Sequence, residues 1–230
     1  ELGVSKPEVI LKNVDGVIQE PYEHLSIDVE QVHQGAIMEV IGTRKGSLTN
    51  MVPDSKGRVR LDFVIPTRGL IGFRSEFMTL TSGSGIMSSV FAHYGEQLGD
   101  DLNRRRNGVL VSMVGGKSLG FSLFNLQPRG RLFLNPNEEV YEGMIIGIHS
   151  RGNDLPVNPI KGKQLTNVRA AGTDENIVLT PPIEFTLEQA IEFIDDDELV
   201  EITPNHIRIR KKLLTENERK RASRLKSELA

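Results

Sequence analysis

The stretch HLSIDVEQV, residues 24–32, decides the fold of the first half of the chain. Its apolar residues Leu25, Ile27 and Val29 alternate with polar residues such as Asp28. Alternation with a period of two places the two sets on opposite faces, which predicts a half-buried β-strand. The sheet that contains this strand should have one apolar face for helices to cover.

The segments that follow this strand continue an alternating order of helices and strands. Apolar spacing and turn residues predict a helix at 35–43, strands at 47–53 and 57–66, a helix at 70–80 and a strand at 85–94. The order β-α-β-β-α-β is that of ferredoxin-like sandwiches, in which two helices cover one face of a four-stranded sheet.

We expect three parts in the chain. Residues 1–20, with a strand at 8–12, would be the tail of a preceding domain or a linker; residues 21–94 would be the ferredoxin-like domain; and residues 95–230 a β-rich second domain with one or two helices. The predicted class is therefore α+β. Because the chain does not begin with Met, we expect a piece of a longer protein.

Within the second domain, short strand-like runs alternate with turn residues. They predict strands at 109–114, 119–126, 130–134, 141–149, 199–203 and 206–211. Thr186 is a candidate N-cap for a helix, and the pattern Thr215-Glu216-Asn217-Glu218 predicts a capping box that starts a basic helix over 215–230.

The composition excludes several classes of protein. There is no Cys among the 230 residues, so a disulfide framework and a Cys-based zinc site are excluded. No run of about 18 apolar residues predicts a membrane span, and the first residues do not resemble a signal peptide. We therefore expect a cytoplasmic protein with no membrane partner.

The net charge of −3 conceals an asymmetry near the end of the chain. Residues 183–203 contain eight acidic and no basic residues, whereas residues 204–230 contain nine basic and three acidic ones. A basic tail often indicates a nucleic-acid partner. The alternative is that the two blocks pair with each other.

The sequence contains no complete catalytic motif. Residues 116–118, Gly-Lys-Ser, look like the end of a Walker A motif, but position 111 is Val rather than the required Gly. The next segment, 119–126, also has the pattern of a strand instead of a helix. The five His residues are scattered, and Asp195–Asp197 is better explained as a solvated turn than as a cation site. We expect no catalytic residue, metal or cofactor in these 230 residues.

The long segment 150–182 has little periodicity, and segments of this kind within a domain are usually functional or disordered. It combines cations with amide and hydroxyl groups, which suit phosphates and base edges. It lacks aromatic residues for stacking on bases. These residues alone do not distinguish among three interpretations: an RNA-contact loop, a protein-docking loop and an ordinary ordered loop.

Several stretches of the second half resemble the carboxy-terminal domain of the BipA/TypA translational GTPases. They are residues 107–110 (NGVL), 141–147 (YEGMIIG), 153–155 (NDL), 165–175 (LTNVRAAGTDE), 186–190 (TLEQA), 197–201 (DELVE) and 207–212 (IRIRKK). In the first half, residues 66–75 (PTRGLIGFRS) resemble the last ferredoxin-like domain of elongation factor G.

The resemblance implies a carboxy-terminal part of a ribosome-binding GTPase whose upstream domain, absent here, would bind GTP and Mg. It implies large-subunit assembly and stress adaptation as roles, and 23S rRNA and the A-site tRNA acceptor end near the peptidyl-transferase region as partners. The RNA-contact candidates are Arg151, Lys161, Lys163, Asn167, Arg169, Thr173, Arg208, Arg210, Lys211 and Lys212. The alternative is a protein-interaction module that docks a ribosomal protein or another domain through the acidic block 184–201.

Overall fold

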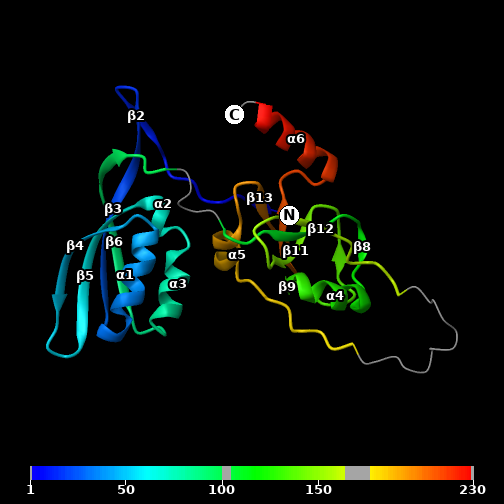
Figure 1. Ribbon diagram of the computed structural model, residues 1–230, viewed down its shortest axis with the longest axis horizontal. Coiled ribbons are helices and arrows are strands. Elements are labelled where there is room, and N and C mark those ends of the chain that lie inside the picture. The colour runs from blue at the N-terminus through cyan, green and yellow to red at the C-terminus, as the bar shows by residue number, and fades with distance from the viewer. Residues whose placement is uncertain (1, 100–104, 164–176, 229–230) are drawn as a thin grey trace. The chain divides into compact units, whose positions relative to one another are not determined.

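The computed structural model describes residues 2–99, 105–163 and 177–228 (Figure 1). The chain forms two compact units, one of Pro7–Arg104 and one of Glu1–Lys6 together with Arg105–Ala230. These limits differ from the expected division, because residues 1–20 do not form a single tail. Strand β1 (Leu2–Val4) belongs to the sheet of the second unit, whereas β2 (Lys12–Val14) belongs to that of the first.

In place of the strand expected at 8–12, the chain forms β2, which begins at Lys12. β2 forms a hairpin with β3 (Val17–Glu30) through Asp15 and Gly16, which both have positive φ angles, of 53° and 85°. A two-residue turn of this kind matches the twist of the paired strands. β3 therefore begins seven residues before the strand predicted from its alternating centre at 24–32.

The Pro7–Arg104 unit has the predicted β-α-β-β-α-β order. β4 (Ser47–Pro53), β5 (Arg58–Pro66) and β6 (Ile86–Glu96) join β3 in the spatial order β6-β3-β5-β4, with all pairs antiparallel. The helices are η1 (Gln31–His33), α1 (Gln34–Thr43), α2 (Thr67–Leu70) and α3 (Phe73–Leu80). The predicted helix at 70–80 is thus interrupted, because Gly72 has a φ of 73°.

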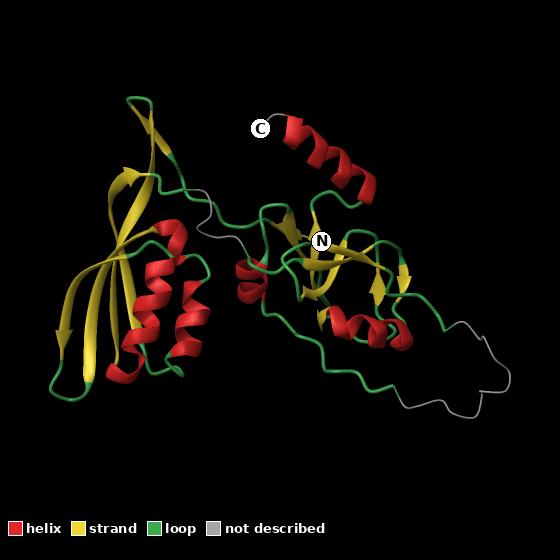
Figure 2. Cartoon of the chain, viewed as in Figure 1, coloured by secondary structure: helices red, strands yellow, loops and turns green. Residues whose placement is uncertain are grey.

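The core of this unit lies between one face of the sheet and helices α1 and α3, which lie along that face in Figure 2. Leu25, Ile27 and Val29 of β3 are buried there, as their alternation predicts, against Phe73 and Phe77 of α3. The α+β class and the ferredoxin-like arrangement are confirmed.

The second unit is built on a mixed sheet. Its strands are β7 (Val109–Ser112), β9 (Gly130–Leu132), β11 (Met144–His149), β12 (Leu155–Val157), β13 (Glu198–Ile202) and β14 (Ile207–Lys211). They follow the order β1-β13-β14-β11-β7-β12, with β9 also on β11. β8 (Gly116–Lys117) and β10 (Glu139–Val140) form a separate pair.

Three α-helices accompany this sheet in the described residues: α4 (Gly120–Leu126), α5 (Leu187–Phe193) and α6 (Glu216–Glu228). A 3-10 turn, η3 (Gln127–Arg129), follows α4. The N-cap at Thr186 is confirmed, with a complete capping box to Gln189. Thr215 and Glu218 form the predicted reciprocal bonds at the start of α6.

The strand predicted at 119–126 is wrong, because this segment is helix α4. Ser122, Leu123 and Leu126 are buried at helical spacing, while Phe124 is exposed. Burial against the core of β7, β9 and β11 therefore overrides the tendency of the segment to be a strand. Residues 116–118 are thus followed by a helix, as in a Walker A motif, but Val111, buried in β7, occupies the position that requires Gly.

None of the helices in the described residues is long and apolar enough to cross a membrane.

Candidate nucleic-acid interface

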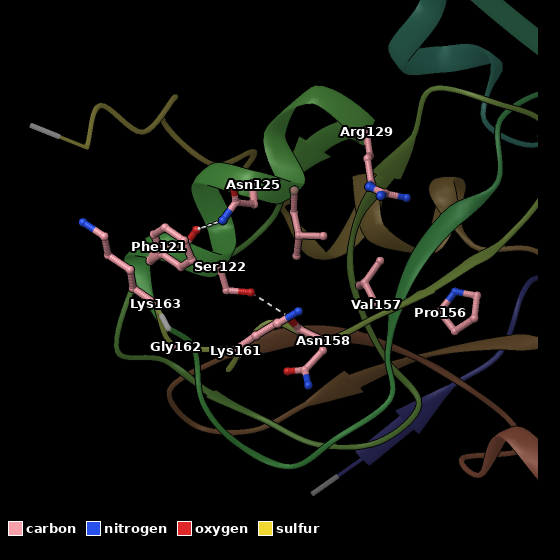
Figure 3. Close-up of a pocket in the computed structure, with 11 residues that line it drawn as sticks. Phe121, Ser122, Asn125, Arg129, Pro156, Val157, Asn158, Lys161, Gly162 and Lys163 are labelled. Atoms are coloured by element: carbon pink, nitrogen blue, oxygen red, sulfur yellow. Dashed lines mark hydrogen bonds between the residues drawn. The ribbon is translucent and has the colours of Figure 1, made fainter. Parts of the chain in front are cut away.

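A groove lies between helix α4 and the segment that follows strand β12, within the predicted loop 150–182 (Figure 3). Its volume is about 620 Å³, within the usual range for ligand pockets of roughly 300–1,000 Å³. It is lined by Phe121, Ser122, Asn125, Leu126, Arg129, Pro156, Val157, Asn158, Lys161, Gly162 and Lys163. The loop and a helix that was predicted as a strand thus build one concave surface.

Main-chain and side-chain hydrogen bonds hold the two walls of the groove together. β12 pairs in parallel with β7, so the chain leaves the sheet next to the start of α4. There Leu119 N donates to Pro159 O at 3.0 Å, and Ser122 Oγ donates to Asn158 O at 2.6 Å. The segment 155–160 is therefore fixed to the core rather than being an irregular loop.

Cationic side chains line the groove at its rim. Arg129, Lys161 and Lys163 are all exposed, and Figure 3 shows Lys163 beside Phe121, Lys161 next to Asn158 and Arg129 on the side away from Phe121. Among the described residues, no carboxylate pairs with Arg129 or Lys161. These two charges are therefore available to an anion from outside the unit.

Two asparagines of the groove have amide groups whose orientation is fixed by local bonds. Asn125 Nδ2 donates to Phe121 O at 2.8 Å, and Asn158 Oδ1 accepts from Ile160 N at 3.0 Å. In the described part of the chain, Asn125 Oδ1 and Asn158 Nδ2 have no partner. The groove therefore presents one oriented acceptor and one oriented donor.

The other predicted loop residues divide into two groups. Arg151 is exposed on the turn after β11, and its neighbour Ser150 donates from N to Arg129 O at 2.8 Å. Asn167, Arg169 and Thr173 lie outside the described residues. The structure brings Lys161 and Lys163 together with Arg129, which was not predicted from the sequence.

Strand β14 carries the remaining candidates, and two of them share one carboxylate. Arg208 Nη1 lies 4.0 Å from Glu201 Oε1, and Arg210 Nε lies 3.5 Å from Glu201 Oε2. Tyr141 Oη also donates to Glu201 Oε2, at 2.5 Å. Two arginines on one face of the strand share a single carboxylate, so together with Glu201 they retain a net positive charge. Lys212 directly follows β14 and is exposed.

Lys211 has a different environment, because its side chain is buried. Its Nζ lies 2.6 Å from Asp154 Oδ2, 2.8 Å from Asp197 Oδ2 and 3.0 Å from Glu198 Oε1. Burial by itself lowers the pKa of Lys211, but the three carboxylates outweigh it and raise that pKa. An ammonium group enclosed in this way cannot reach an external phosphate, so we remove Lys211 from the interface.

Much of the acidic block 184–201 is also neutralised within the unit. Glu198 is fully buried, and Arg105 Nη1 and Nη2 donate to its two oxygens at 2.9 and 2.8 Å. Burial alone raises the pKa of Glu198, but the bonds from Arg105 and the charge of Lys211 bring it below its usual value. Lys6 lies 3.4 Å from Asp195. Part of the acidic block thus pairs with Lys6 and Arg105, and part with the basic block, through Lys211, Arg208 and Arg210.

The α4 side of the groove was not predicted from the sequence. Phe121, Asn125 and Arg129 fell in a predicted strand and its turn, where no concave surface was expected. The leucines at positions 119, 123 and 126 follow helical spacing and could have indicated a helix. No group of residues suited to a metal ion occurs within the described ranges.

Comparisons with known proteins place both units in families. A model of the TypA/BipA C-terminal domain matches residues 107–216, and a model of the elongation factor G C-terminus matches residues 17–105. A crystal structure of a protein from Thermus thermophilus aligns with 35% of this chain and 12% of that chain, at 22% identity and a TM-score of 0.34.

Similar full-length proteins are named large ribosomal subunit assembly factor BipA. The protein from Haemophilus influenzae is 63% identical over 224 residues, which is 97% of this chain and 36% of that protein. The protein from Escherichia coli K12 is also 63% identical, over 97% of this chain and 37% of its own length. The protein from Buchnera aphidicola is 57% identical over 229 residues, which is 100% of this chain and 38% of that protein.

Proposed function

The chain belongs to the TypA/BipA family, of whose members it spans little more than a third, and we propose that residues 105–230 bind RNA on the large ribosomal subunit. The observation that carries this proposal is the groove, whose rim holds Arg129 and Lys161 without carboxylate partners in the described residues. The relatives are named as assembly factors of that subunit, which supports the ribosome as the partner.

The finer identity of the RNA is part of the same proposal. We propose 23S rRNA and the A-site tRNA acceptor end as targets, contacted by the groove together with Arg151, Arg208, Arg210 and Lys212. Asn167, Arg169 and Thr173 remain candidate contacts. Ribosomal proteins could add contacts through the part of the acidic block that is not paired internally.

Binding of GTP by the longer protein is also part of the proposal. We expect GTP and Mg to be bound by a domain of the longer protein, and the 230 residues to supply binding without catalysis. The site of action would be the cytoplasm, where ribosomes are assembled.

Cosedimentation of the chain with purified large subunits tests the proposal. Replacing Arg129 and Lys161 together by Gln should weaken binding and reduce the slope of log K against log salt by about 2, roughly one per lost phosphate contact. The reason is that each contact releases a counterion. The matched control replaces Lys56 and Arg74, two exposed cations of the other unit, by Gln.

Two outcomes would contradict the proposal. Equal binding by the Arg129/Lys161 variant and by the control would remove the groove from the interface. Binding that survives complete digestion of the RNA, with isolated ribosomal proteins as the remaining partner, would favour the acidic block 184–201 as a protein-docking surface instead.

A further inference from the structure

We infer that the groove between α4 and β12 holds one unstacked nucleotide of single-stranded RNA, with its base against Phe121 and its flanking phosphates at Lys161 and Arg129. This inference rests on the proposed function and makes it more specific. It concerns what the groove selects, whereas charge alone would accept any nucleic-acid backbone.

The aromatic residue of the groove is recessed. Phe121 is half-buried and lines the groove, whereas Phe124, three residues later on the same helix, is 45% exposed and does not line it. Every base has a π-face that can stack on such a ring. A base inside a duplex is already stacked on both sides and cannot enter the groove, so the ring selects unpaired RNA.

The lining of the groove suits a base rather than a phosphate chain. Leu126 and Val157 are buried apolar residues of this lining. In the same lining, Asn125 Oδ1 can accept and Asn158 Nδ2 can donate a hydrogen bond, because the opposite atom of each amide is already bonded to the main chain. Each nucleobase carries both donors and acceptors on its edge, and oriented amides are side chains that bind such edges.

The positions of the cations agree with a nucleotide that spans the groove. Figure 3 shows Lys163 beside Phe121, Lys161 in the middle next to Asn158, and Arg129 on the side away from Phe121. A nucleotide within a strand has a phosphate on each side of its sugar, so one phosphate can meet Lys161 and the other Arg129. The volume of about 620 Å³ accommodates a single nucleotide and its hydration.

Fluorescence anisotropy on the 230-residue chain tests the inference with a labelled 12-nucleotide RNA, free and annealed to its complement. Phe121→Leu keeps an apolar side chain and removes the ring, and it should weaken binding of the single strand about fivefold or more. Asn158→Asp keeps the oxygen that accepts from Ile160 N and removes the donor, and it should weaken binding about tenfold. Duplex binding should not change in Phe121→Leu.

Each variant has a matched control. Phe124→Leu removes an exposed ring from the same helix outside the groove. Asn13→Asp adds the same charge at an exposed asparagine whose Oδ1 accepts a similar local bond, from Gly16 N at 3.0 Å. Both controls should bind single-stranded RNA as the parent chain does.

The results separate this inference from the proposed function. If Phe121→Leu and Phe124→Leu bind the single strand equally, or if inorganic polyphosphate displaces it as well as unlabelled RNA does, the nucleotide site is refuted. The proposed function survives that result as long as removal of Arg129 and Lys161 weakens cosedimentation with the large subunit. A chain that binds neither RNA nor the large subunit would contradict both.

Discussion

The ammonium nitrogen of Lys211 lies 3.0 Å from a carboxylate oxygen of Glu198, and both side chains are buried in the second unit. Arg105 binds the same carboxylate through two hydrogen bonds and lies with its guanidinium carbon 4.5 Å from the centre of the Phe193 ring. The carboxylate of Glu198 thus connects strands β13 and β14 to Arg105, the first residue described after Gly99. A basic residue expected at the RNA surface is thus part of the framework.

Replacing Lys211 by Met should lower the free energy of unfolding by about 3 kcal/mol or more, because Glu198 would lose one of its two buried cations. Urea denaturation followed by circular dichroism measures the change. Lys212→Met, at an exposed neighbour, should stay within about 0.5 kcal/mol of the parent. If both variants are equally stable, the buried pair does not stabilise the unit.

The second unit should lose stability in acid because of Glu198. Its pKa is lowered in the folded state, so its contribution is present above the ordinary carboxylate pKa and is lost as the pH falls through the folded value. In urea titrations between about pH 5 and pH 3, Glu198→Gln should show a weaker dependence on pH than the parent. An unchanged dependence would assign the acid sensitivity to other carboxylates.

Gly130 lies where β9 meets β11, and a methyl group on its Cα would overlap Ile148 O. Gly130→Ala should therefore destabilise the unit by about 2 kcal/mol or more and displace the adjacent Arg129 at the groove. Thermal unfolding measures the first effect and RNA binding the second. Gly3→Ala is the control, since a methyl group there contacts nothing within 4 Å; equal melting temperatures would show that the strands adjust.

In the first unit, Arg68 Nε donates to Glu20 Oε2 at 2.5 Å, and Glu20 is fully buried. Glu20 Oε1 also accepts from Leu98 N at 2.9 Å. Arg68→Met would leave this carboxylate without its cation and should cost about 3 kcal/mol. Hydrogen exchange should then speed up at the Leu98 amide, whereas Arg74→Met, at an exposed arginine of α3, should leave it protected.

Local pattern was sufficient for most of the first unit. The alternation of Leu25, Ile27 and Val29 placed β3 correctly because one face of that strand packs on helices and the other does not. The ends of β3 were missed, since the hairpin at Asp15 and Gly16 depends on pairing with residues outside the alternating run. Strand ends are determined by partners that the local pattern does not contain.

The groove was less predictable for a related reason. The segment 119–126 is short and mostly apolar, so periodicity alone does not separate a strand from a helix. Its helical form depends on burial of Leu123 and Leu126 against strands that lie elsewhere in the sequence. Likewise, Lys211 pairs with Asp154 and Asp197, and counting charges along the chain cannot place these carboxylates beside it.

The pairing of Leu2 with Ile202 has a consequence for biosynthesis. β1 leaves the exit tunnel long before β13, and the whole Pro7–Arg104 unit is inserted between β1 and the rest of its sheet. The inserted unit has all its strands in one continuous segment and can fold during translation, as domains generally do. The sheet of the second unit must instead wait with an unpaired β1 until residue 202 has emerged, so β1 reaches its final place only after the whole intervening unit has been made.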